Sequence, residues 1–250
     1  ANPETGWGLV GDQFNAMDML GHYGSPTWFN LGDKDLGTHI RRTELLRDGW
    51  TLSQITEDLS RRIGVRHRVA PMSDQTVKTM VETDEGNLPF QVYFVERRCE
   101  PIARRVHFEI TELAKPSPSF EGALESASAL VFCPSNPFLS IGPILALDGV
   151  RQTIENFVGP RIVVSPIVDG RALRGPAGKL MSELGHDVSC VGVAHWYQGL
   201  CDIFLLDEVD RRHVTEIALL GMRVEVARTV MVTEADKIRL ARRVLEMVKS

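Results

Sequence analysis

The chain has 250 residues, of which 43% are hydrophobic and 24% are charged, and its formal net charge at pH 7 is -5. This length allows one large domain or two small ones, and the acidic balance argues against a nucleic-acid partner, because nucleic-acid-binding proteins usually carry a basic surplus. The sequence shows no apolar run long enough to cross a bilayer and no signal peptide, so we expect a cytoplasmic protein without a membrane partner.

The first half of the chain predicts two helices followed by short strands. Helical spacing over residues 35–48 ends at Gly49, a suitable C-terminal cap. A second helix is predicted over residues 52–63, with Thr51 as its N-cap and Gly64 as its end. Short β-rich runs then follow at residues 68–71, 77–83, 91–96 and 105–110. We therefore expect a small β-containing subdomain within residues 66–120.

The second half alternates short apolar runs with helical patterns. Strands are predicted at residues 129–133, 162–165, 188–193, 202–206 and 222–226. Helices are predicted at residues 143–157, 177–184, 209–220 and 234–248. This alternation indicates an α/β fold, in which a mainly parallel sheet carries helices on both faces. We treat residues 1–250 as a single domain of this class, where ligands bind beyond the carboxyl ends of the strands.

A polar segment at residues 134–143 follows a predicted strand and precedes a predicted helix. Ser135, Asn136 and Ser140 bring small polar side chains, and Gly142 permits close approach to the backbone. Backbone N–H groups at the start of a helix favour an anion, so the segment is a candidate phosphate site. The alternative is an ordinary polar turn, because the segment is not a Walker sequence.

A second candidate site lies at residues 170–179, again between a strand and a helix. Arg174 and Lys179 supply positive charge, while Gly175 and Gly178 leave the backbone accessible to an anion. Loops that follow successive strands of a parallel sheet lie side by side at one edge, which favours a shared phosphate site. The alternative is that the basic side chains are solvated and the glycines only shape the turn.

Further polar residues gather at positions 30–39. Asp33 and Asp35 can hold a divalent metal ion, orient a hydroxyl group or act as a base. Thr38 and His39 follow them in the predicted helix. Asp35 alone is better explained as a helix cap, whereas both interpretations stay open for the group.

Ser73, Asp74 and Thr76 follow an apolar stretch and alone are typical of a turn. Other kinds of site lack support. The seven histidines show no zinc-binding spacing, and no nucleophile elbow or glycine-rich dinucleotide loop is present. The four cysteines are not paired as C-x-x-C, so we expect them to be reduced and buried.

Six segments, taken in order, resemble the 2-phospho-L-lactate transferase family, which makes the deazaflavin coenzyme F420. They are NPETGWG (2–8), LGDKDLGTHI (31–40), PMSD (71–74), PSNP (134–137), SIGPI (140–144) and GPAGKLM (175–181). Each segment is weak alone, but the combination is specific and runs over essentially the whole chain. The resemblance implies a Rossmann-like fold, usually dimeric, and a cytoplasmic transferase that depends on Mg²⁺.

The resemblance also implies a reaction and the residues that serve it. Such enzymes move a phospho-lactyl or phospho-enolpyruvyl group from a guanosine diphosphate ester to the ribityl hydroxyl of the deazaflavin Fo, and GMP leaves. The donor's nucleotide and phosphates are then expected to bind Ser135, Asn136, Ser140, Gly142, Arg174, Gly175, Gly178 and Lys179. Fo is expected to bind Asn30, Asp33, Asp35, Thr38, His39, Ser73, Asp74 and Thr76, with Asp33 or Asp35 as the candidate base.

The sequence departs from the family at its start. Relatives begin with a strand and a Gly-Gly-Thr-Gly type loop, followed by an acidic Asp-Leu-Asp segment, and neither occurs in these 250 residues. The main metal ligands are therefore expected in that segment. Two alternatives stay open: a non-catalytic regulator of the same fold that binds nucleotide sugars, and a Rossmann-like nucleotide binder with unrelated chemistry.

Overall fold

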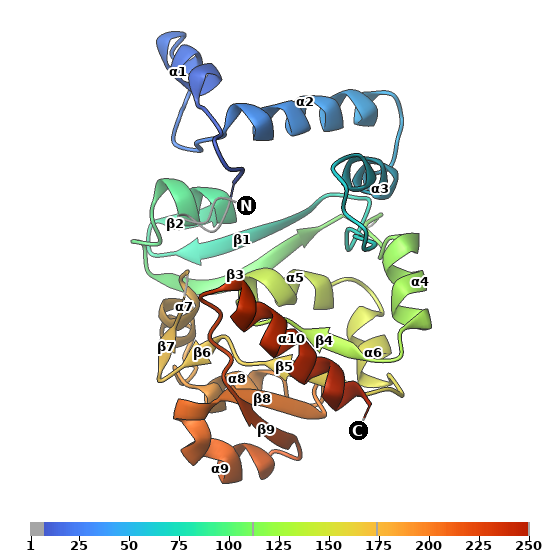
Figure 1. Ribbon diagram of the computed structural model, residues 1–250. Coiled ribbons are helices and arrows are strands. Elements are labelled where there is room, and N and C mark those ends of the chain that lie inside the picture. The colour runs from blue at the N-terminus through green and yellow to red at the C-terminus, as the bar shows by residue number, and fades with distance from the viewer. Residues whose placement is uncertain (1–7, 112, 174, 250) are drawn as a thin grey trace.

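A computed structural model describes residues 8–111, 113–173 and 175–249. The lower half of the molecule in Figure 1 contains a parallel four-stranded sheet with the strand order β4-β5-β8-β9. The strands are β4 (Leu130–Phe132), β5 (Arg161–Val164), β8 (Ile203–Asp207) and β9 (Arg223–Ala227). This parallel sheet confirms the predicted α/β class.

Helices cover both faces of the parallel sheet. On one face, α10 (Glu234–Val248) packs Leu240 and Val244 against Ile162 and other strand residues. Val163, the next residue of β5, belongs to a larger core on the opposite face, as the period of two in a strand requires. The helices that contribute to that core are α5 (Gly142–Leu145), α6 (Val150–Glu155), α7 (Ala177–Glu183), α8 (Cys190–Trp196) and α9 (Val214–Ala218), which follows the 3-10 helix η3 (Glu208–His213).

A second, antiparallel sheet lies within the range predicted for the β-containing subdomain. Its strands are β1 (Val77–Thr83), β2 (Gly86–Pro89) and β3 (Ala103–Ile110), in the order β2-β1-β3. Buried side chains of this region, including Val81 and Ala103, belong to the same core as the parallel sheet. The two sheets are therefore held together by one shared hydrophobic interior.

Three helices precede the antiparallel sheet, and a fourth follows it. They are α1 (Asn15–His22), α2 (Asp33–Arg47), α3 (Leu52–Arg62) and α4 (Pro118–Ser126). The Thr51 hydroxyl accepts a hydrogen bond from the backbone N–H of Gln54 in a capping box, which confirms the predicted start of α3. Gly49 and Gly64 have φ of 87° and 82°, a left-handed conformation that ends α2 and α3 as predicted. In Figure 1, α1 and α2 project beyond the two sheets.

The strand predicted at residues 188–193 is wrong, because this segment forms α8. The Ser189 hydroxyl accepts a hydrogen bond from the backbone N–H of Gly192 and starts a helix there. β5 pairs directly with β8, so no place for another strand exists between them. Residues 190–194 are all buried, and a short apolar run of this kind has no period that separates a strand from a helix.

The strand predicted at residues 91–96 is also wrong. The segment forms a π-helix, η1 (Val92–Glu96), in which Tyr93 is buried. Phe90 and Phe94, four residues apart, stack with their ring centroids 5.4 Å apart, a helical pairing. β1 already pairs with β2 on one edge and with β3 on the other. This segment therefore cannot pair with β1, despite its β-rich composition.

Two further expectations are corrected. Residues 68–71 form no strand, and Arg68 and Val69 are exposed. The helix predicted at residues 143–157 is interrupted, because Gly149 has a φ of 73° and separates α5 from α6. Several elements were not predicted: α1, α4, β2, the π-helix η2 (Pro137–Ile141), β6 (Ile167–Val168) and β7 (Arg171–Ala172). None of the helices in the described part of the chain is long and apolar enough to span a membrane.

Candidate functional site

The two candidate phosphate segments meet at one edge of the parallel sheet. β4 and β5 pair in parallel, so the segments that follow them leave from the same edge. The chain after β4 forms η2, and the chain after β5 passes through the β6–β7 hairpin into α7. Residues of α7 contact η2. The structure thus places the two segments side by side, as their order in the chain predicts.

Asn136 shapes the first of these segments. Its Oδ1 accepts hydrogen bonds from the backbone N–H groups of Phe138, at 2.9 Å, and Leu139, at 3.1 Å. Its Nδ2 is buried and has no hydrogen-bond partner among the described residues. A buried donor without a partner costs about 1–3 kcal/mol. Nδ2 of Asn136 is therefore a donor that an oxygen atom of a ligand would satisfy.

The neighbouring residues of this segment differ in exposure and in contacts. Ser135 is half-buried and Ser140 is exposed. Gly142 packs closely against other parts of the protein rather than facing an open site. A Cβ atom there would lie 2.9 Å from Cζ of Phe108 and 3.3 Å from the backbone oxygen of Pro137. The absence of a side chain at Gly142 allows this segment to pack against β3.

Protein groups hold the Lys179 ammonium in the second segment. Its Nζ donates a hydrogen bond to the backbone oxygen of Pro101, at 2.8 Å, and lies 2.5 Å from Oε1 of Glu183. Burial alone would lower the pKa of Lys179, but hydrogen bonds from its ammonium to Glu183 and Tyr93 outweigh burial and raise it. Lys179 thus ties α7 to the chain that precedes β3, and it must exchange these partners if it is to bind a phosphate.

The other predicted residues of the second segment shape the backbone. Gly175 has a φ of 69°, a conformation that favours glycine. Gly178 packs against Val188, because a Cβ atom added there would lie 3.4 Å from Cγ1 of Val188. The predicted contact of Arg174 lies outside the described residues.

Asp33 joins α1 to α2. Its Oδ1 accepts a hydrogen bond from the backbone N–H of Ala16, at 3.1 Å, and its Oδ2 accepts one from Nδ2 of Asn15, at 3.0 Å. The bond from Ala16, followed by that from Asn15, lowers the pKa of Asp33. Asp33 is therefore ionised at neutral pH and a weak base. Asp35 lies in the same first turn of α2 and is half-buried.

Asp12 is a polar residue of this region that is not among the predicted site residues. Its Oδ1 accepts hydrogen bonds from the backbone N–H groups of Gln13 and Lys34, both at 2.9 Å. Its Oδ2 is buried and has no partner in the described part of the chain. A Cβ atom at Gly32 would lie 2.0 Å from this oxygen, so a larger residue at position 32 would displace the Asp12 carboxylate. A single Asp in a loop gives no sequence signal for such a role.

The remaining predicted residues of α2 are turned to local partners or to solvent. Nδ1 of His39 lies 2.6 Å from Nη2 of Arg42 on the same helix. The Thr38 hydroxyl donates a long hydrogen bond, 3.4 Å, to the backbone oxygen of Lys34. Asn30 is exposed.

The other group of predicted Fo-binding residues lies near the start of α3. Oδ1 of Asp74 accepts a hydrogen bond from the backbone N–H of Ser53, at 2.6 Å. Ser73 is buried and its Oγ accepts a hydrogen bond from the backbone N–H of Gln75, at 3.1 Å, while Thr76 is exposed.

The two groups of predicted Fo-binding residues lie toward opposite ends of α2 (Figure 1). Asp33 begins this helix of 15 residues. The chain at its other end leads directly to α3, where the backbone N–H of Ser53 donates a hydrogen bond to Asp74. A helix of this length spans roughly 22 Å. The structure therefore does not gather all the predicted Fo-binding residues around one point.

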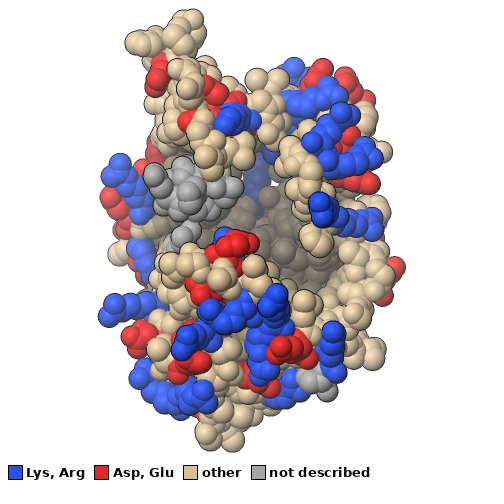
Figure 2. All heavy atoms as spheres, in the orientation of Figure 1, with Lys and Arg blue, Asp and Glu red and all other residues tan. Residues whose placement is uncertain are grey.

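A pocket of about 640 Å³ lies beside Asp74. Several basic side chains line it, together with residues from α3 and α4; the basic ones are Arg61, Arg66, His67 and Arg68. This group was not predicted from the sequence, where Arg68 belongs to a segment predicted as a strand. Figure 2 shows a deep hollow in the same view of the molecule, open between α2 and α3 above and α10 below.

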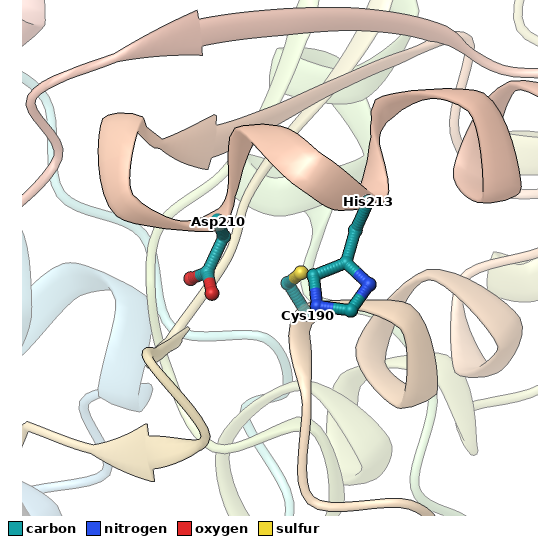
Figure 3. Close-up of side chains that lie close together, drawn as sticks. All are labelled: Cys190, Asp210 and His213. Atoms are coloured by element: carbon teal, nitrogen blue, oxygen red, sulfur yellow. The ribbon is translucent and has the colours of Figure 1, made fainter.

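Only one group of three His, Cys or acidic side chains in the described part of the chain has ligand atoms within 4.8 Å of one another. It consists of Cys190, Asp210 and His213 (Figure 3). Sulfur and imidazole ligands do not suit Mg²⁺, which prefers oxygen. Both oxygens of Asp33 accept hydrogen bonds from the protein, and one carboxylate does not supply the several oxygen ligands that Mg²⁺ needs.

Comparison with known proteins gives one consistent family. A family model described as 2-phospho-L-lactate transferase CofD matches residues 7–247. The chain is 37% identical to a 2-phospho-L-lactate transferase of Methanosarcina mazei over 240 residues, 96% of this chain and 78% of that protein. It is 40% identical to a phosphoenolpyruvate transferase of Streptomyces griseus over 255 aligned residues, 99% of this chain and 80% of that protein.

A solved structure shares the fold. The crystal structure of protein BH3568 from Bacillus halodurans superimposes with a TM-score of 0.59 over 86% of this chain and 72% of that one. The sequence identity is 14%, so this likeness concerns the fold alone.

Proposed function

The chain belongs to the 2-phospho-L-lactate transferase CofD family, a family of transferases, and from this we propose the reaction that it catalyses. It transfers a phospho-lactyl or phospho-enolpyruvyl group from a guanosine diphosphate ester to the ribityl hydroxyl of the deazaflavin Fo, in coenzyme F420 biosynthesis. The two transferred groups correspond to the names of the relatives, one a 2-phospho-L-lactate transferase and the other a phosphoenolpyruvate transferase. We expect the protein to act as a cytoplasmic homodimer.

The reaction is a substitution at phosphorus. The hydroxyl oxygen of Fo forms a bond to the phosphorus that carries the three-carbon acid, and the bond from this phosphorus to the bridging oxygen breaks. The electron pair of that bond leaves with GMP, and the hydroxyl proton passes to a base or to water. Positioning and charge neutralisation supply most of the acceleration in phosphoryl transfer, because the transition state is loose.

The observation that carries the proposal is the pair of segments at the carboxyl ends of β4 and β5. They lie where ligands bind in parallel α/β sheets, and α7 of one contacts η2 of the other. The first segment contains the buried, unpartnered Nδ2 of Asn136. We assign the donor's phosphates to this edge, with Nδ2 of Asn136 as a donor to a phosphate oxygen.

Asp35 and Asp33, the two candidate bases, differ in their hydrogen bonds. Hydrogen bonds already occupy both oxygens of Asp33 and lower its pKa. Asp35 is half-buried in the same helical turn. We therefore assign acceptance of the Fo proton to Asp35 and a positioning role to Asp33, which holds the start of α2.

Magnesium stays a proposal that rests on the family. Mg²⁺ needs several oxygen ligands in near-octahedral geometry. The described residues gather no such set of three or more acidic side chains. We therefore derive no step of the reaction through the metal.

Titration of the protein with Fo, followed by the fluorescence of the deazaflavin, tests the assignment. Saturable binding that strengthens in the presence of the guanosine diphosphate ester is the expected result. A nucleotide-sugar-binding regulator has no reason to bind a deazaflavin. Binding of nucleotide sugars without binding of Fo would move the assignment to that alternative.

A further inference from the structure

Three side chains from two separate elements converge beside the β6–β7 hairpin. Cys190 comes from α8, and Asp210 and His213 come from η3 (Figure 3). Their ligand atoms, a sulfur, a carboxylate oxygen and a ring nitrogen, all lie within 4.8 Å of one another. Cys190 is 1% exposed and Asp210 is 2% exposed, so two of the three donors are withdrawn from water.

The local backbone accounts for this convergence. Asp210 and His213 are three residues apart in a 3-10 helix, where residues at this spacing eclipse each other on one side. Oδ2 of Asp210 accepts a hydrogen bond from the backbone N–H of Asp169, at 3.0 Å, which fixes the carboxylate and leaves its Oδ1 available to a metal. The hairpin, η3 and α8 therefore meet at this cluster.

The hydrogen bonds of the His213 ring suit a metal ligand. Figure 3 shows one ring nitrogen on the side of the Cys190 sulfur and the other on the opposite side. Nε2 accepts a hydrogen bond from Nε of Arg212, at 3.1 Å, so the ring proton is on Nδ1, which lies 3.2 Å from Oε2 of Glu216. A carboxylate that binds the Nδ1–H group and leaves Nε2 unprotonated is the arrangement that orients histidine ligands of metals.

We propose that Cys190, Asp210 and His213 form a binding site for a zinc-type divalent ion, with water as the fourth ligand. The combination of thiolate, imidazole and carboxylate ligands selects zinc over magnesium or calcium. Zinc lies about 2.3 Å from sulfur and about 2.0–2.2 Å from nitrogen or oxygen, so the three donors must close in by roughly 1 Å. His213 is 25% exposed on its side chain, which gives water and the ion access.

Arg212 competes with the ion for Nε2 of His213. Its side chain is 66% exposed, and its ion pair with Asp169 is long, 4.0 Å, so little holds it in place. Removal of Arg212 frees the metal-binding nitrogen at small structural cost. This residue therefore offers a variant that strengthens metal binding, whereas most substitutions can only weaken it.

The bound ion would hold α8, η3 and the β6–β7 hairpin together. This hairpin leads into the segment of residues 170–179, so the ion braces one wall of the proposed donor site without contact to the donor. The site is independent of the proposed reaction, because its ligands are not among the residues assigned to Fo or to the guanosine ester.

The test uses metal analysis and cobalt substitution of the purified protein. About one zinc ion per chain after extensive dialysis is expected, and Co²⁺ should give the near-ultraviolet charge-transfer absorption of a thiolate ligand. Cys190→Ser and His213→Ala should remove this absorption, and His195→Ala, an exposed histidine on α8, should leave it unchanged.

Arg212→Ala keeps the test valid if the ligand variants fold poorly. It should lower the Kd for Zn²⁺ by about 10-fold or more and raise Tm in the presence of zinc, because the competing donor is gone. Unchanged zinc affinity in Arg212→Ala, or a thiolate–cobalt band that persists in Cys190→Ser, would overturn the proposal. Neither result would affect the transferase assignment, since neither readout uses Fo or the guanosine ester.

Discussion

At the scale of single residues, two atoms of the described chain carry unmet hydrogen-bonding capacity near the candidate sites: Nδ2 of Asn136 and Oδ2 of Asp12. Buried polar atoms without partners are rare in folded proteins, and at a site they indicate where a ligand completes the hydrogen bonding. Asn136 has a structural function as well, because its Oδ1 caps η2. A useful variant must separate these two functions.

Asn136→Asp makes this separation. Asp caps as well as Asn, so the fold should be kept, while the amide donor is replaced by an anionic oxygen that repels a phosphate. We expect kcat/KM for the guanosine diphosphate ester to fall by at least about 10-fold, which corresponds to ~1.4 kcal/mol, with Tm little changed. The exposed Asn156→Asp supplies a control for the added charge. Wild-type kinetics in Asn136→Asp would remove Asn136 from the donor site.

The two acidic residues of α2 should respond differently to loss of charge. Asp35→Asn should lower kcat by about 10-fold or more if Asp35 accepts the Fo proton. Asp33→Asn should mainly lower Tm, because Asn can accept only one of the two hydrogen bonds that Asp33 accepts from Ala16 and Asn15. Steady-state kinetics and thermal unfolding of both variants separate these roles. A larger loss of kcat in Asp33→Asn than in Asp35→Asn would reverse the assignment.

Residue types and spacing predicted the candidate site in part. The segments around Asn136 and Lys179 were identifiable because polar residues and glycines follow predicted strands, and the structure places these segments together. The partners of Lys179 were not predictable, since Pro101 lies 78 residues away in the chain. The Cys190 cluster was missed for the same reason: its members have no zinc-binding spacing in sequence and meet only after folding.

At the scale of elements, α8 depends on a glycine at its centre. A Cβ atom at Gly192 would lie 2.0 Å from the backbone oxygen of Asp187, which cannot move aside as a side chain can. Gly192→Ala should destabilise the protein by about 1–3 kcal/mol through overpacking. Gly122→Ala in α4 is the matched control, because nothing lies within 4 Å of its added Cβ and alanine favours a helix. Equal unfolding free energies of the two variants by denaturant titration would contradict this account of α8.

The starts of β5 and β8 are joined by a charged pair. Nε and Nη2 of Arg161 donate hydrogen bonds to Oδ2 and Oδ1 of Asp202, at 2.9 and 2.6 Å. The bonds from Arg161 hold the pKa of Asp202 below its usual value. A lowered pKa in the folded state means that this stabilisation is present above the ordinary pKa of Asp, about 3.9, and is lost as the pH falls through the folded-state pKa.

Asp202→Asn should therefore cost about 1 kcal/mol of unfolding free energy at neutral pH, a modest value because the pair is partly exposed. The difference from the wild type should shrink when the pH falls below about 4. Denaturant titrations across this range check the result, with the exposed Asp148→Asn as the control. A difference that grows on acidification would show that the sign of the pKa shift is wrong.

The elements that sequence predicted well are those whose pattern agrees with their place in the fold. Val-rich β5 and apolar β8 are largely buried in the parallel sheet, and the two ends of α10 agree with the predicted range. The segments that became α8 and η1 have the composition of strands but join neither sheet. Strand pairing is a property of the assembled sheet, and no local pattern in the sequence contains it.

At the scale of the whole molecule, one hydrophobic interior joins the antiparallel sheet to the parallel sheet. Lys179 adds a polar link between α7 and the chain that precedes β3, through the backbone oxygen of Pro101. The proposed donor segments lie at the edge of the parallel sheet, and the predicted Fo-binding residues lie on α2 and next to the start of α3. The proposed reaction therefore requires donor and acceptor to meet between these parts of the molecule, where Figure 2 shows the surface to be hollowed.

Product formation tests this account most directly. The protein is incubated with Fo, Mg²⁺ and either the lactyl or the enolpyruvyl guanosine diphosphate ester, and the products are identified by mass spectrometry. The account predicts Fo linked through phosphate to the three-carbon acid, together with an equal amount of GMP. No linked product and no GMP from either ester, under conditions in which Fo binds, would contradict the proposed transfer reaction.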